Sequence, residues 1–129
     1  MTFIGMPLED AQEKEPVPEG EYDCIIKSAE IVDSKAIRGQ ENIRVMIEVT
    51  DSDFPNTPMI FHYLAGLHPD DDDVKRNNKL LQTKAFLNLF NIPYSGGFAL
   101  EDMQNQEAKC HLVQEEYNGR ISNKIQVPW

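Results

Sequence analysis

The stretch Glu107–Val127, EAKCHLVQEEYNGRISNKIQV, decides the fold predicted for this chain. Asn118 and Gly119 lie at its centre, and both residue types tolerate the positive φ angles that a two-residue type I′ turn requires. A turn of two residues also fixes the register of the strands on either side of it. The sequence therefore predicts a β-hairpin with a defined pairing.

This register sorts the hairpin side chains onto two faces, because neighbouring residues of a strand point in opposite directions. The mostly polar face is expected to have the facing pairs Tyr117–Arg120, Glu115–Ser122, Val113–Lys124 and His111–Gln126. The apolar face is expected to pack in the core through Leu112–Ile125 and Cys110–Val127, with Ile121 nearby. The tip then presents an aromatic ring and a guanidinium to solvent.

The composition is that of an ordinary globular protein, with 40% hydrophobic and 26% charged residues. The 129 residues predict one domain, 19–129, preceded by an acidic arm or tail, 1–18. No apolar run approaches the roughly 20 residues of a membrane span, and no secretory signal is visible. Two cysteines do not make a disulfide framework. We therefore expect a cytoplasmic protein with reduced thiols and no membrane partner.

The net charge of −10 argues against a general binder of polyanions. The charge is uneven, since residues 1–23 carry seven acids and one lysine, whereas the remainder carries fifteen acids and eleven bases. Four of those fifteen acids form the run Asp70–Asp73. A basic surface on this protein must therefore be local.

Three strands are expected before the hairpin. The first begins after Gly20, and its apolar residues change parity near Lys27–Ser28, which predicts a β-bulge there. The second, around Ile43–Val49, alternates apolar and polar residues. The third, Met59–Leu64, is apolar on both parities. Its second face is either covered by the fold or an exposed aromatic platform.

One helix is expected from about Val74 to Asn91, largely buried apart from a narrow polar stripe. The acids Asp70–Asp73 precede it, where negative charge complements the helix dipole. Pro93 ends it, because the residue before a proline avoids the α region.

The order of three strands, a helix and two strands predicts a mainly β fold, a five-stranded OB-fold barrel with one α-helix between strands three and four. The first and fourth strands are neighbours in such a barrel. Cys24 and Cys110 are therefore expected to lie close together inside it, as two reduced thiols, with a crosslink as the alternative.

Three segments carry a resemblance to a known family: PEGEYDCIIKSAEI at 18–31, LLQTKAFLNLFNI at 80–92 and EEYNGRISNKI at 115–125. They resemble the phage-encoded single-stranded DNA-binding proteins of OB fold that act in phage replication and recombination modules. The resemblance implies non-catalytic, largely sequence-independent binding of single-stranded DNA in the host cytoplasm, with phage or host replication proteins as further partners. Many such proteins have an acidic C-terminal tail, whereas the acidic segment here is at the N-terminus.

A protein that binds single strands needs cations along a groove and flat side chains on which bases stack. On an OB barrel the groove crosses strands two and three, between the first loop and the last hairpin. The candidate nucleic-acid-binding residues are Lys35, Arg38, Arg44, Phe61, Tyr63, Tyr117, Arg120 and Lys124. The alternatives are that Arg120 and Lys124 neutralise neighbouring glutamates and that Phe61 and Tyr63 are core residues.

Other readings rest on fewer residues. The acidic arm and the net charge favour an OB-like protein-interaction or phage accessory module without DNA binding. His68 with Asp70–Asp73 suggests a metal-dependent nuclease, but consecutive acids splay around the first helical turn, so helix capping explains them better. We expect no catalytic residues, metal or cofactor. Phe3, Ile4 and Met6 either dock on a neighbouring molecule or fray, and Phe3 and Trp129 are candidates for a homo-oligomer interface.

Overall fold

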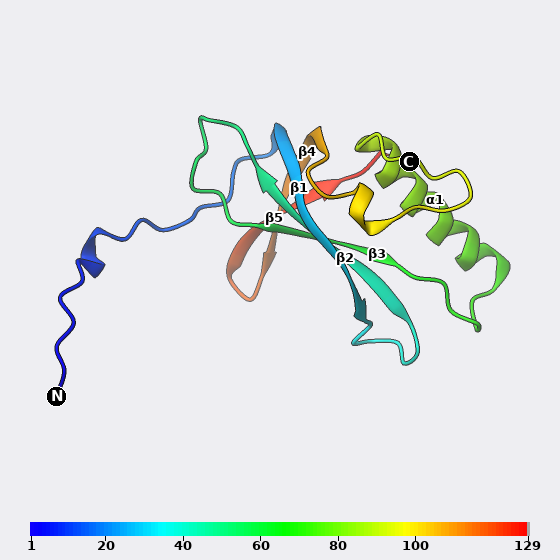
Figure 1. Cartoon of the computed structure of the whole chain (residues 1–129), viewed down its shortest axis with the longest axis horizontal. Coiled ribbons are helices and arrows are strands. Elements are labelled where there is room, and N and C mark those ends of the chain that lie inside the picture. The colour runs from blue at the N-terminus through cyan, green and yellow to red at the C-terminus, as the bar shows by residue number, and fades with distance from the viewer. Residues whose placement is uncertain (129) are drawn as a thin grey trace.

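The computed structural model describes Met1–Pro128, so the expectation for Trp129 lies outside the described residues. The chain forms a five-stranded antiparallel β-sheet in the order β3-β2-β1-β4-β5, with one α-helix beside it (Figure 1). The elements are β1 (Gly20–Asp33), β2 (Glu41–Val49), β3 (Ile60–Ala65), α1 (Asp73–Leu89), β4 (Glu107–Tyr117) and β5 (Arg120–Gln126). The turns Leu8–Asp10 and Leu100–Asp102 are 3₁₀-helical. None of the helices among residues 1–128 has the length and apolar character needed to cross a membrane.

The expected mainly β class, the order of elements and the pairing of β1 with β4 are confirmed. The predicted closure of the barrel is not confirmed, because β3 and β5 are the two edges of the sheet and do not pair. A hollow of about 210 Å³ lies between them, lined by side chains from β3, α1 and the end of β5. Side chains rather than backbone hydrogen bonds therefore bring the two edges together.

The hairpin has the predicted register. Tyr117 faces Arg120, and the pairing continues to His111 opposite Gln126. Asn118 and Gly119 adopt φ angles of 52° and 76°, which is why these residue types occupy the turn. The core placement of Ile121 is wrong: it faces Glu116 and is 48% exposed. The tip extends beyond the core, so its apolar parity has nothing to pack on there.

The predicted irregularity in the first strand is also confirmed, since the register between β1 and β2 shifts between Ile26 and Ser28. The bulge lets Cys24 and Ile26 point inward before it and Ala29 after it. The outward face of β1 after the bulge then consists of Ser28 and Glu30.

The helix departs from expectation in its burial. Within α1 only Lys79, Phe86 and Leu87 are buried, whereas Leu80 and Leu81 are 47% and 41% exposed. The prediction of a largely buried helix is therefore wrong. Only the C-terminal half packs on the core, while the first turns project past the sheet (Figure 1). The capping prediction is confirmed, because Asp72 accepts a hydrogen bond from the Lys75 backbone N–H at 2.7 Å.

The segment that leads into β1 is part of the packed structure. Val17 is 1% exposed, and its N–H donates to Oδ1 of Asn123 at 2.8 Å. Its carbonyl accepts hydrogen bonds from the amide groups of Gln114 and Asn123, both at 2.9 Å. The core therefore begins within the segment that the sequence assigns to the arm.

Both cysteines are free and buried, as expected for reduced core thiols. Cys24 and Cys110 lie on the paired strands β1 and β4. A hydrogen bond with the Cys110 thiol, together with burial, raises the pKa of Cys24, so this thiol stays protonated and unreactive at neutral pH.

Candidate nucleic-acid interface

The side chains of β3 alternate between the core and solvent. Ile60 and Leu64 are buried, whereas Phe61 and Tyr63 are 47% and 56% exposed. The two exposed rings are two residues apart, so they lie next to each other on one face of the strand. Of the two readings of this strand, the aromatic platform is the one that the fold adopts.

Arg44 of β2 lies across from Tyr63 in the sheet and beside Phe61. Its guanidinium carbon is 5.8 Å from the centroid of the Phe61 ring, within the range of a cation–π contact. The guanidinium also pairs with Glu30 of β1, and this hydrogen bond raises the pKa of Arg44. Its side chain remains 36% exposed, so one cation and two rings share an open surface.

Met46 and Glu30 complete this face, and neither is among the candidate binding residues, although the alternation of β2 predicts that Met46 faces outward. Met46 faces Phe61 across β2 and β3 and accepts a hydrogen bond from Ser28 Oγ at 3.2 Å. Glu30 faces Arg44 across β1 and β2. Both could have been found by extending the alternation of each strand to its neighbours, once the bulge in β1 had fixed the register. We call this surface the outer face; it consists of Ser28, Glu30, Arg44, Met46, Phe61 and Tyr63.

The loop at 34–40 carries Lys35 and Arg38, both exposed. The loop itself is held at several points. Ser34 Oγ accepts the N–H of Ile37 at 3.1 Å, and the carbonyl of Arg38 lies 3.0 Å from Nε2 of His68. The backbone of this loop is therefore fixed while its two cations are free to move.

A buried lysine fixes the end of that loop, and no sequence pattern predicts its burial. The Lys79 ammonium donates to Asp71 at 2.8 Å, to the Gly66 carbonyl at 2.8 Å and to Oε1 of Gln40 at 2.9 Å. This cluster joins α1 to the loop at 34–40 and to the chain just after β3. A hydrogen bond from Lys79 lowers the pKa of Asp71. A Cβ at Gly66 would lie 1.8 Å from the Glu41 carbonyl oxygen, so the chains pass there with no room for a side chain.

The hairpin tip carries the remaining candidates. Tyr117 is 78% exposed, and Arg120 is exposed opposite it. Lys124 instead lies 3.3 Å from Glu115, so the neutralising alternative holds for this residue. The tip and the loop at 34–40 both extend toward the lower edge of Figure 1. The structure thus groups Arg44, Phe61 and Tyr63 directly, and leaves Lys35, Arg38, Tyr117, Arg120 and Lys124 on two separate projections.

The residues behind the nuclease reading have other partners. Asp71 pairs with Lys79, and Asp72 caps α1. Among residues 1–128, no group of three or more His, Cys, Asp or Glu side chains is arranged to hold a metal ion.

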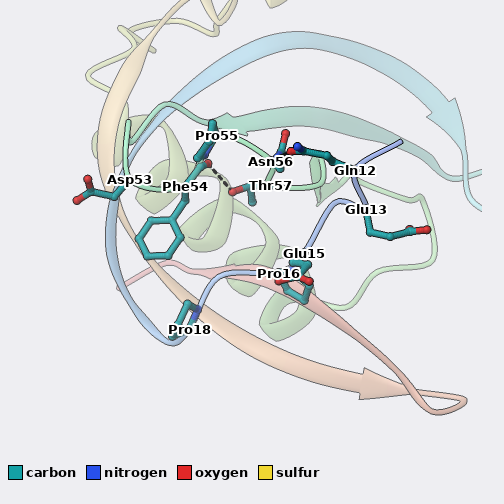
Figure 2. Close-up of a pocket in the computed structure, with 10 residues that line it drawn as sticks. All are labelled: Gln12, Glu13, Glu15, Pro16, Pro18, Asp53, Phe54, Pro55, Asn56 and Thr57. Atoms are coloured by element: carbon teal, nitrogen blue, oxygen red, sulfur yellow. Dashed lines mark hydrogen bonds between the residues drawn. The ribbon is translucent and has the colours of Figure 1, made fainter. Parts of the chain in front are cut away.

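A hollow of about 770 Å³ lies away from the outer face. It is bounded by Pro16 and Pro18 of the arm and by the loop at 53–57 (Figure 2). Thr57 Oγ1 donates to the Phe54 carbonyl at 3.0 Å and stiffens the loop. The charged residues that line the hollow are Glu13, Glu15 and Asp53. With acids and no bases in its wall, the hollow has nothing to attract phosphate.

Comparison with known proteins adds no identity. No model of a protein family matches the chain, and no curated protein matches it.

Proposed function

We propose that this protein is a non-catalytic binder of single-stranded DNA with little sequence preference. The observation that carries the proposal is the exposed pair Phe61 and Tyr63 beside Arg44 on the outer face. Aromatic rings give every base a surface on which to stack, and a neighbouring cation attracts the backbone. An exposed apolar pair on a strand costs solubility, so its presence argues for a partner that covers it.

We further propose that the sheet is an OB-type fold whose last edge pair is held by side chains. The strand order and the helix between β3 and β4 support this, because they are the order found in OB barrels. In that fold the single strand crosses β2 and β3, with the loop at 34–40 and the hairpin tip on either side. Lys35, Arg38 and Arg120 then contact phosphates, while the rings stack on bases.

The resemblance of three segments to phage proteins supports a wider setting for this activity. In this proposal the protein belongs to a phage replication or recombination module and works in the host cytoplasm. Its further partners are then phage or host replication proteins. The net charge of −10 favours local contacts with one strand over adhesion to duplex DNA.

The test is a titration of a fluorescent single-stranded oligonucleotide and of its duplex, followed by anisotropy at several salt concentrations. The double variant Phe61→Ala/Tyr63→Ala should bind at least about 30-fold more weakly, since each stack contributes roughly 1–3 kcal/mol. Val74→Ala, which removes an exposed apolar side chain elsewhere, serves as the control and should bind as the parent does. Absence of binding by the parent at low salt, or equal binding by the double variant, would refute the proposal.

A second candidate is a protein-interaction module without DNA binding. The ion pair between Glu30 and Arg44 favours this candidate, because a carboxylate already neutralises the central cation of the outer face. In that case the parent protein binds no oligonucleotide at low salt, while Phe61→Ala/Tyr63→Ala abolishes retention of a replication protein on the immobilised chain.

A further inference from the structure

The first eleven residues of the arm extend away from the domain (Figure 1). Its apolar side chains are exposed, at 89% for Phe3, 70% for Ile4, 60% for Met6 and 70% for Leu8. Four large apolar groups within six residues are costly to leave in water. A segment of this composition is suited to bury them against another surface.

The base of the arm sets its direction. The Glu15 N–H donates to the Asn56 carbonyl at 3.0 Å, and Asn56 Nδ2 donates to Oε1 of Gln12 at 3.0 Å. Val17 is then fixed in the core by Asn123. These contacts direct the arm away from the sheet, on the side opposite to α1 (Figure 1). The arm therefore extends away from its own helix (Figure 1).

A groove that matches the arm in chemistry lies on α1. Its volume is about 450 Å³, and it is lined by Leu81, Lys84, Ala85, Asn88, Leu89 and Pro128. The floor is apolar, and Leu81 is 41% exposed, although it lies in the middle of a helix. Within residues 1–128, part of the exposed face of α1 therefore forms an apolar groove without a packing partner.

The charges of the two surfaces are complementary. The arm continues from its apolar residues into Glu9 and Asp10, both exposed. Lys84 lies in the groove and is exposed. Among the described residues, Lys84 forms no ion pair. An arm with apolar residues followed by acids fits a groove with an apolar floor and one unpaired lysine in its wall.

We propose that the arm of one copy, Phe3–Asp10, docks in the α1 groove of a second copy of this chain. Phe3 and Ile4 cover the apolar floor, and the acids Glu9 and Asp10 approach Lys84 in its wall. The interaction requires neither DNA nor the outer face, so it goes beyond the proposed function.

Sedimentation velocity over a range of protein concentrations tests this association, with the full chain and without DNA. The parent should form dimers or larger species. Leu81→Ser, or Phe3→Ser/Ile4→Ser, should weaken association at least about tenfold, because each removes apolar area buried at the contact. Ile121→Ser is the matched control, since Ile121 is 48% exposed on β5 near the hairpin tip and lies outside the groove. It should associate as the parent does.

Mixing distinguishes this contact from any other. The Leu81→Ser variant keeps its arm, and the Phe3→Ser/Ile4→Ser variant keeps its groove, so an equal mixture should associate although neither variant does alone. Lys84→Glu should weaken association, and Glu9→Lys/Asp10→Lys added to it should restore part of it. A parent that stays monomeric at every concentration, an unaffected Leu81→Ser variant, or a mixture that remains monomeric would overturn the proposal. The double variant Phe61→Ala/Tyr63→Ala should associate normally, so this test fails separately from that of DNA binding.

Discussion

The two faces of β3 carry similar chemical groups in opposite environments. On the side of α1, the His62 ring stacks on Phe86 with centroids 4.8 Å apart and planes 6° apart, and Lys79 pairs with Asp71. On the outer face Arg44 lies over the Phe61 ring and pairs with a glutamate. Each side therefore combines a cation, a carboxylate and an aromatic ring.

What differs is how completely each cation is satisfied. The Lys79 ammonium has three different acceptors around it, and its side chain is 8% exposed. Arg44 pairs with one carboxylate, and its side chain is 36% exposed. A fully satisfied cation contributes to stability, whereas a partly satisfied and accessible one is available to a ligand. The comparison thus separates a side of β3 that supports the fold from the exposed side on which the proposed function rests.

The largest expected effect is on the inner side. Lys79→Met should lower the melting temperature by roughly 10 °C, because it removes the ammonium that pairs with Asp71 and takes the side-chain donor from the Gly66 carbonyl and from Gln40. Lys75→Met is the control, since the Lys75 side chain is exposed on the same helix. Thermal unfolding followed by circular dichroism measures both. Equal melting temperatures for the two variants would contradict the structural role.

The Lys79–Asp71 pair also predicts how the difference in stability between the parent and Lys79→Met depends on pH. The pKa of Asp71 is lowered in the folded protein, so the stability from this pair is complete above the unfolded value near 3.8. It is lost as the pH falls through the lower, folded pKa. The gap in stability between the parent and Lys79→Met should therefore narrow only in strong acid. Lys79→Met/Asp71→Asn should recover part of the loss at neutral pH, because the second change removes the unpaired charge.

A smaller effect is expected on the outer face, where the fold does not depend on the cation. Arg44→Met should weaken binding of a single-stranded oligonucleotide and reduce the slope of log affinity against log salt by about 0.7, the value for one phosphate contact. Glu30→Gln should raise the affinity a few-fold, because it releases Arg44 from its ion pair. Lys27→Met is the control, because Lys27 pairs with Glu48 at 3.7 Å and is not part of the outer face. An unchanged salt slope for Arg44→Met would show that this cation does not contact phosphate.

The difference between the two sides also explains what the sequence could predict. Local patterns were sufficient for the hairpin register, the bulge at Lys27–Ser28 and the cap at Asp72, because each depends on neighbouring residues and their backbone preferences. The position of Arg44 on an outward parity followed from strand alternation alone. These are the features that place the outer face.

Features that depend on distant contacts were not predictable in this way. Lys79 reaches partners that are 8, 13 and 39 residues away, and no pattern in the helix marks it as buried. The exposure of Leu80 and Leu81 depends on where α1 overhangs the sheet, which periodicity does not encode. Closure of the barrel likewise depends on how two edge strands meet in space.

The smallest expected effect returns to the inner side and concerns His62. Burial lowers the pKa of its imidazole below the ordinary value of about 6.5, so the unfolded chain takes up a proton more readily than the folded one. Stability should be full above about pH 6.5 and decline below it, with a slope of at most about 1.4 kcal/mol per pH unit. Urea unfolding between pH 7.5 and 5.5 measures this decline.

His62→Phe should reduce that slope, because phenylalanine keeps a ring on Phe86 without a titrating group. His111→Gln is the control: His111 lies on the surface of β4, 3.5 Å from Glu19, and its loss should leave the contribution of His62 intact. If His62→Phe retains the full slope, the ring does not titrate as a buried group, and the inner side of β3 is more accessible to water than its packing implies. The contrast between the two faces would then rest on Lys79 alone.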